Sequence, residues 1–421
     1  MLCPTPIQPA GGRDLSAYLS FLRDNARWLG AGFLLSLLST FGQTAFVAVF
    51  AGDITARFDL GQGSWGAIYA LGTTVAAMLM LWTGTWADRH PLAPLSAWVL
   101  AGLGLACLGM ALSPALWLLP LLIVGLRLFG QGMLSHLAYV AMARWFAARR
   151  GQALAIAALG FTIGQAVLPL AFTAAMVRVG AEALWLLAAA ICLGAIWPMR
   201  RLLAQPRVAM GAEAAATEAP GRAGRHWTRA DVLRDRLFWM LLPALMGPPA
   251  FGTAFFFFQV HLPEVKGWSQ VGFVALFPVV MAVSTLTTFA SGALIDRVGA
   301  SRLLPVALLP MAAGFLWLGW ASTLGAALPA VILLALTMGA MATVPVSLWA
   351  EQFGTRHLGA IKAAAMAAMT LGTALGPGLV GALIDRGVDF PGQMPWISCY
   401  FVISAALAWA GLRRERSAEL R

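Results

Sequence analysis

One arginine lies deep inside an apolar run of the sequence, where a charge is costly. Arg127 stands about twelve residues into the run at 115–141, which places it roughly 18 Å deep in a helix that rises 1.5 Å per residue. A guanidinium at that depth in a bilayer costs at least ~2.5 kcal/mol. We interpret Arg127 as the anchor for an anionic group, which it would bind through two parallel hydrogen bonds. The structural alternative is an arginine that holds backbone carbonyls or a neighbouring helix.

Uncharged polar side chains extend this candidate site. Gln131 shares the helix face of Arg127, whereas His136 falls close to the opposite face and is expected to be a packing residue. Three glutamines in other apolar runs either line the same cavity or, taken singly, hold helices together. The predicted binding residues are Arg127, Gln131, Gln43, Gln165 and Gln259.

Other kinds of chemistry are not indicated. The four cysteines stand far apart without metal-ligand spacing, and no hydrolase triad, zinc-ligand set, phosphate-binding loop or dinucleotide fingerprint stands out. No Asp or Glu falls in the middle of an apolar run. We therefore predict no catalytic residue, no metal and no cofactor.

Membrane-spanning helices must position these residues. Hydrophobic residues make up 60% of the chain and charged residues 11%, whereas a soluble chain carries roughly 25% charged residues, so the apolar excess must face lipid. The sequence predicts an all-α integral membrane protein with twelve transmembrane helices in two pseudo-symmetric six-helix bundles. The predicted spans are 27–52, 64–83, 93–112, 115–141, 152–177, 183–199, 237–261, 271–293, 303–322, 326–350, 359–384 and 395–412.

Two features of the seventh span bear on its shape. Gly247-Pro248-Pro249 predicts a kink or a break in the helix, and broken helices often line transport pathways. The following run from Phe255 to Phe258 has two interpretations, a gate or lipid-facing bulk.

The distribution of basic residues predicts the orientation. With the amino terminus in the cytoplasm, 23 of the 28 Lys and Arg residues fall in inner segments and four in outer segments, and Arg127 alone lies within a span. This bias explains the net charge of +11 without nucleic acid as a partner. We expect a monomer that spans the cell inner membrane many times, contacts lipid and has both termini in the cytoplasm.

One long polar gap divides the spans six and six. Residues 200–236 are Ala-rich and basic, which is typical of a cytoplasmic linker. The predicted organisation is a cytoplasmic segment at 1–26, a bundle at 27–199, the linker at 200–236, a second bundle at 237–412 and a cytoplasmic tail at 413–421.

A short motif recurs at the inner end of the second helix of each half. It reads Gly-Thr-Trp-Ala-Asp-Arg at 84–89 and Gly-Ala-Leu-Ile-Asp-Arg at 292–297, as a duplicated six-helix unit would show. A third copy at 381–386 falls on the predicted outer side and is interpreted as chance or helix-end chemistry.

The charges at the inner ends are predicted to latch a gate. The positive-inside rule does not require acids there, so their presence favours ion pairs over ordinary solvated charge. The predicted gating residues are Asp88, Arg89, Arg144, Asp296, Arg297, Glu351 and Arg356.

The repeated motif resembles the loop signature of the major facilitator superfamily, Gly-x-x-x-Asp-Arg-x-Gly. The second copy matches it through Gly299, whereas the first copy has Pro91 in place of the last glycine. The resemblance covers essentially the whole chain. It implies a secondary transporter that moves a small-molecule substrate by alternating access.

The fourth and fifth spans narrow the resemblance. The segments 127–132 and 145–154 resemble monocarboxylate carriers and oxalate–formate exchangers, which carry small organic anions. The fifth span has Gly160 and Gly164 without the following proline of the drug–proton antiporters. The resemblance implies transport of an organic anion, and efflux of drugs or other metabolites is the alternative. A receptor or scaffold is a more distant one.

Proton coupling, as in a symporter, is left open by the sequence. Without a mid-span acid, a coupling proton would need a histidine, the carboxylate of the substrate or a group at a helix end.

Overall fold

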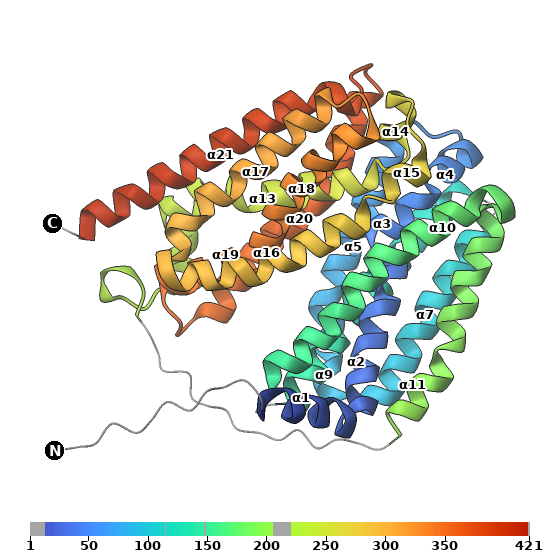
Figure 1. The fold of residues 1–421 in the computed structure, drawn as a ribbon, viewed down its shortest axis with the longest axis horizontal. Helices are drawn as coiled ribbons and strands as arrows, with labels where there is room; N and C mark the ends of the chain where they lie inside the picture. Colours follow the sequence, from blue (N-terminus) through green and yellow to red (C-terminus); the bar gives the residue numbers. More distant parts are fainter. Residues whose placement is uncertain (1–12, 114, 147–148, 205–219, 420–421) are drawn as a thin grey trace.

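The computed structural model of the chain describes residues 13–113, 115–146, 149–204 and 220–419, and every regular element in these ranges is a helix. The helices form two bundles, coloured blue to green and yellow to red in Figure 1. The first bundle contains α1 (Arg13–Asp24), α2 (Ala26–Leu38), η1 (Ser39–Gly42), α3 (Thr44–Val47), η2 (Ala48–Phe50), α4 (Ala51–Phe58), α5 (Gln62–Thr83), α6 (Trp86–Arg89), α7 (Leu92–Leu112), η3 (Leu116–Leu118), α8 (Leu119–Gly125), η4 (Leu126–Leu134), α9 (Ser135–Trp145), α10 (Arg150–Gly194) and α11 (Ile196–Leu202). The second contains η5 (Arg222–Gly224), α12 (Arg229–Arg234), α13 (Arg236–Phe257), α14 (His261–Lys266), α15 (Gln270–Val274), α16 (Phe277–Val298), α17 (Ala300–Trp320), α18 (Leu324–Ala340), α19 (Val344–Phe353), α20 (Leu358–Ile384) and α21 (Phe390–Glu419).

The described residues cross the membrane twelve times. Ten helices are long and apolar enough to span, and the bent pair Ala26–Gly42 and Thr44–Phe58 makes an eleventh span. One of the ten, over Arg150–Leu202, crosses twice because Gly180 breaks it (φ 75°, ψ 165°) and the chain turns back there (Figure 1). A positive φ of this kind is accessible to glycine at little steric cost. The predicted all-α fold with six spans in each bundle is confirmed.

The predicted domain boundaries are only partly covered by the structure. The centre of the predicted linker, 205–219, and residues 1–12 lie outside the described residues. In the described part of the predicted linker, after residue 219, Arg222 forms an ion pair with Asp235, directly before α13. The boundaries at 199, 236 and 412 stay a prediction.

The two bundles meet at one end of the molecule. We call this the distal end; it holds α4, α14 and the turn of α10 at Gly180. The opposite end, which we call the linker end, holds α1, α9, α11 and α19 (Figure 1). Helices α5 and α20 touch backbone to backbone near the distal end, since a Cβ on Gly66 would lie 2.7 Å from the carbonyl oxygen of Pro377. In Figure 1 the bundles separate toward the linker end.

The first span bends by 47° at Gln43, which is extended (φ −82°, ψ 153°) between η1 and α3. Directly before the bend, Gly42 crosses Gly130 of η4, the π-helical segment of the fourth span. A Cβ on Gly130 would lie 2.5 Å from the Cα of Gly42, so neither position has room for a side chain. The crossing brings the backbone of the first span against the turn that carries Arg127.

The sequence predicts a kink or a break in the seventh span, and the break is wrong. Helix α13 runs uninterrupted through Pro243, Pro248 and Pro249, so the kink stays a prediction, and the broken span is the first one instead. Lipid-facing bulk is also wrong for most of the phenylalanine run, because Phe255, Phe257 and Phe258 are buried.

The Gly42–Gly130 crossing gives the first prediction. Gly130→Ala should lower the free energy of unfolding by about 1–3 kcal/mol, as overpacking does, because the new methyl group meets backbone that cannot move aside. The measurement is thermal unfolding of the purified protein in detergent. Gly30→Ala is the matched control, since a Cβ at Gly30 of α2 meets nothing within 4 Å. Equal melting temperatures for the two variants would contradict this reading of the crossing.

Candidate functional site

A cavity of about 290 Å³ lies between the two bundles near the middle of the membrane-spanning region. The first bundle lines it with α5 and η4, through residues that include Thr73, Arg127 and Gln131. The second bundle lines it with α13 and α20, through residues that include Pro249, Met369 and Thr373. The volume is at the lower end of the range for small-molecule pockets, roughly 300–1,000 Å³.

Arg127 is held in place by the bend of the first span. Its Nη1 donates to the carbonyl oxygen of Gly42 (3.2 Å) and to Oγ1 of Thr44 (3.3 Å). The hydroxyl of Tyr69 in turn donates to Oγ1 of Thr44 (2.7 Å), and the Tyr69 ring centre lies 5.2 Å from the guanidinium carbon. A cation over an aromatic face is attracted by the ring quadrupole. The charge is therefore oriented by neutral groups alone.

Two polar atoms along the wall of the cavity have no partner among the described residues. They are Nε of Arg127 and Oε1 of Gln131. Arg127 is only 4% exposed, and the ion pairs of the described residues do not involve it. Buried polar groups nearly always find partners, so a cluster of unpaired donors and acceptors beside a cavity indicates a place for a ligand.

The structure brings together two of the five predicted binding residues. Arg127 and Gln131 both line the central cavity. Gln43 and Gln165 are buried but do not line it, although Gln43 adjoins the two residues that hold Arg127. Gln259 does not line the cavity either, and its Nε2 donates across the bundles to the carbonyl oxygen of Ala45 (2.6 Å).

His136 packs as expected. Its Nε2 lies 3.1 Å from the carbonyl oxygen of Gly84, away from the central cavity.

Two stripes of residues that face each other across the cavity were not predicted from the sequence. One stripe is Thr73, Ala76, Ala77 and Met80 of α5, and the other is Met366, Met369, Thr370 and Thr373 of α20. Both follow the spacing i, i+3, i+4, i+7 of one helix face, so the signal was available. It was hidden because thioether and methyl groups look like ordinary packing residues in an apolar span.

The hydrogen bonds that the structure describes for the predicted gating residues each lie within a single bundle. Glu351 accepts hydrogen bonds from the backbone N–H of Ala300 (2.9 Å) and from the hydroxyl of Ser301 (2.5 Å), so it caps α17 inside the second bundle. Asp296 and Arg297 are exposed and form no ion pair with the described residues. The side chain of Asp88 lies outside the described part, and Arg89 and Arg356 are exposed.

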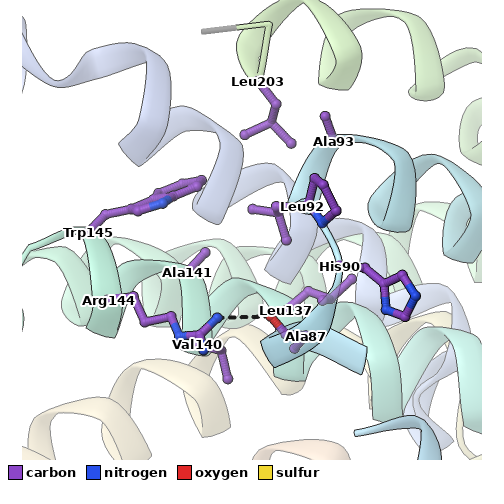
Figure 2. Close-up of a pocket in the computed structure, with 11 residues that line it drawn as sticks. Ala87, His90, Leu92, Ala93, Leu137, Val140, Ala141, Arg144, Trp145 and Leu203 are labelled. Carbon is purple, nitrogen blue, oxygen red and sulfur yellow. Dashed lines mark hydrogen bonds between the residues drawn. The ribbon is translucent and has the colours of Figure 1, made fainter. Parts of the chain in front are cut away.

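Arg144 borders a second pocket, of about 220 Å³, at the linker end of the first bundle. Figure 2 shows its Nη1 donating to the carbonyl oxygen of Ala87 (2.9 Å) beside His90. Every residue around this pocket belongs to the first bundle, and most are apolar. A pocket within one bundle cannot be exposed to the two sides in turn by a movement between bundles.

The distal end carries the remaining histidine of interest. His261 is nearly buried, and its Nε2 lies 3.5 Å from Oδ1 of Asp389. Burial lowers the pKa of His261, and the charges of Asp389 and Glu264 partly oppose that shift. The imidazole is therefore neutral near pH 7.

A comparison with protein families gives one match over most of the chain. A family model described as Major Facilitator Superfamily matches residues 32–377. A relative in Thermoproteus tenax, described as an uncharacterized 38 kDa protein in the 23S RNA operon, is 29% identical over 370 residues. The matched region covers 86% of this chain and 89% of that relative.

Solved structures with the same fold are transporters. A bacterial homologue of the human lysosomal transporter Spinster, in an inward-facing and unoccupied conformation, has a TM-score of 0.70 at 16% identity and covers 93% of this chain and 98% of its own. A D-xylose–proton symporter has a TM-score of 0.68 at 16% identity, and the match covers 91% of this chain and 97% of the symporter. The nucleoside transporter NupG, in a mutant form, has a TM-score of 0.68 at 12% identity, and the match covers 94% of this chain and 100% of NupG.

The position of the cavity gives the second prediction. In a background without the native cysteines, Thr373→Cys should react with a membrane-impermeant maleimide at least about tenfold faster than Leu371→Cys. Leu371 is 47% exposed on the same helix but does not line the cavity. A thiol that faces lipid has a raised pKa, and each unit by which the pKa rises lowers its thiolate fraction about tenfold. The label must enter from the linker end. Equal rates, or labelling from the distal end alone, would contradict the placement of the cavity.

Proposed function

We propose that this chain, which belongs to the major facilitator superfamily, moves a small organic anion across the membrane through the cavity between its bundles. As a member of that family it is a transporter and not an enzyme. The observation that carries the anionic substrate is Arg127, a buried cation beside the cavity with an unpaired Nε and no ion pair to a carboxylate of the described residues. An anion arriving from solution would neutralise this charge without a permanent partner.

The chemistry of the cavity wall supports a small carboxylate with a second polar group. Arg127 offers a donor for the carboxylate, and Oε1 of Gln131 needs a donor from the substrate, such as a hydroxyl. Met80 and Met369 supply soft, adaptable surface for a short apolar part. A monocarboxylate of a few carbons fits this pattern.

Efflux of drugs or other metabolites is the second candidate. The methionines on both walls favour it, because thioethers adapt to ligands of varied shape. A cationic drug would meet the charge of Arg127, however, and a neutral solute would leave that charge unpaired. Substrate charge therefore separates the two candidates.

We propose that the linker end faces the cytoplasm, so that the structure represents the inward-facing state of a protein in the cell inner membrane. The bundles touch at the distal end and separate toward the linker end (Figure 1), which supports this assignment. Asp88, Arg89, Arg144, Asp296, Arg297, Glu351 and Arg356 would then latch the cytoplasmic end in the opposite state. Gln43 and Gln165 would join the site when the bundles move. A single chain encloses the cavity, which fits a monomer.

A coupling proton would have to be carried by His261, by His136 or by the substrate. No Asp or Glu lies in the middle of a span among the described residues, so a buried carboxylate cannot serve. His261 stands at the distal contact between the bundles, beside a pocket of about 290 Å³ that both bundles line.

The third prediction tests the substrate charge. Arg127→Gln should weaken binding of a small carboxylate such as L-lactate by at least about 30-fold, since truncating one partner of a buried charge pair costs ~2 kcal/mol or more. Arg127→Lys should recover part of the loss, because lysine keeps the charge but lacks the planar fork. Thermal shift with a panel of anions, cations and neutral solutes, followed by flux in proteoliposomes, makes the measurement.

Arg178→Gln is the control for the loss of an arginine outside the cavity, because Arg178 is exposed and does not line the cavity. It should bind as the unchanged protein does. Unchanged uptake in Arg127→Gln, or a preferred substrate with net positive charge, would overturn the anionic assignment.

The fourth prediction tests the orientation. Reporter domains fused at the carboxyl terminus and inserted in the 205–219 segment should both be active in the cytoplasm, whereas a reporter at 388 should be active outside, as the charge bias requires. A linker reporter that is active outside would reverse the assignment of the two ends.

A further inference from the structure

The bundles are joined at the distal end by a carboxylate that caps a helix of the opposite bundle. Oδ2 of Asp385, at the end of α20, accepts a hydrogen bond from the backbone N–H of Gly63, in the first turn of α5 (2.9 Å). The cap position of α5 itself is Gly61, which has no side chain to offer. The first turn of α5 thus receives from the second bundle the anion that a helix start usually finds in its own sequence.

Glycines make this contact possible. A Cβ on Gly61 would lie 2.8 Å from Oδ2 of Asp385, and one on Gly63 would lie 2.6 Å from it. Farther along the same helix pair, a Cβ on Gly66 would meet the carbonyl oxygen of Pro377. One on Gly381 would meet that of Gln62. Both helices therefore have glycine at the positions where their backbones touch.

The contact explains the third copy of the repeated motif. Gly381 and Asp385 are the first and fifth residues of Gly-Ala-Leu-Ile-Asp-Arg at 381–386, four apart and on the same face of α20. The glycine allows the backbones of α20 and α5 to touch, and the aspartate caps α5. Helix-end chemistry is the correct one of the two interpretations that the sequence allowed.

Other contacts between the bundles at this end are neutral. The Phe257 ring stacks on Trp65 (5.5 Å between ring centres) and tilts against Tyr69 (4.8 Å). Gln259 donates to the carbonyl oxygen of Ala45 (2.6 Å). Among the described residues, Asp385 is the charged side chain with a hydrogen bond across the distal contact.

We propose that Asp385 is the positioning residue that holds the distal end closed, and that its release from α5 accompanies opening of the cavity to the distal side. The interaction exists only while α5 and α20 touch, so it stabilises one state of the cycle and not the other. Asp385 is already exposed to water, so when the bundles separate water replaces the N–H of Gly63 at the carboxylate and hydrates that freed N–H. The inference rests on the alternating access of the proposed function but not on the identity of the substrate.

The experiment measures the distance between the bundles at the distal end, in liposomes and without substrate. Spin labels go on Val179, at the turn of the first bundle, and Val271, in α15 of the second, both exposed, with the four native cysteines replaced by serine. The parent protein should show mainly the short distance of the closed distal end. Asp385→Asn should raise the ratio of open to closed molecules about two- to fivefold, the effect of one charge at a helix terminus.

Two charge controls separate a latch from a general loss of acid. Asp53→Asn removes an exposed carboxylate at the same end, in α4, without a hydrogen bond across the bundles among the described residues, and it should leave the ratio unchanged. Asp385→Glu keeps the carboxylate and should restore at least half of the closed population lost in Asp385→Asn. If Asp385 were needed only for folding, Asp385→Glu would not restore the closed population in this distance measurement when both variants insert normally.

A pair of glycine variants tests the same contact through shape. Gly66→Ala should raise the open fraction, because its Cβ would lie 2.7 Å from the carbonyl oxygen of Pro377. Gly378→Ala, in the same interface, should not, because its nearest neighbour would be 3.8 Å away. An unchanged distance distribution in Asp385→Asn, or an equal shift in Asp53→Asn, would overturn the proposal. Failure of every anion to bind, with these shifts intact, would instead overturn only the substrate assignment.

Discussion

A guanidinium buried in the middle of a membrane protein has to be surrounded by acceptors, and the first bundle is built around that requirement. Helical backbone offers no free acceptor in mid-span, because its carbonyl oxygens already bond within the helix. The bend at Gln43 solves this by releasing the carbonyl oxygen of Gly42 toward Arg127. The hydroxyl of Thr44, just past the bend, provides the second acceptor. The break in the first span and the charge in the fourth are thus two parts of one arrangement.

Close approach of backbones is the second requirement, and glycine meets it. Lipid tails are as apolar as leucine, so helices in a membrane gain little from burying large side chains and associate through small residues that permit close packing. The crossing of Gly42 and Gly130 serves this purpose inside the first bundle, and that of Gly66 with Pro377 serves it between the bundles. The first contact fixes the position of Arg127. The second contact has to come apart if the bundles alternate. Its backbones therefore pack closely, but the free energy of the contact has to be small.

Most of the spans were predictable because twenty apolar residues in a row permit few other structures. Arg127 and Gln131 were predictable as neighbours for a similar reason, since a polar pair four residues apart shares a helix face whether the turn is α or π. The break at Gln43 was not predictable, because it depends on a crossing with Gly130, which lies 87 positions away in the sequence. The contact that Gln259 makes was not predictable for the same kind of reason. A buried amide in a span has the same local signature whether it meets a ligand or, as here, the carbonyl oxygen of Ala45.

The two ends of the molecule use the same motif in different ways, and this follows from which helix each copy meets. The copy that ends at Arg297 stands at the linker end, where the bundles are apart, and its Asp296 is exposed. In the copy that begins at Gly381, Asp385 meets the first turn of α5, where N–H groups lack partners within the helix. An aspartate one residue after the end of a helix is well placed to cap a neighbour that starts there. The aspartate of the motif can therefore cap a helix of the other bundle only in a state in which the start of that helix lies within hydrogen-bond distance.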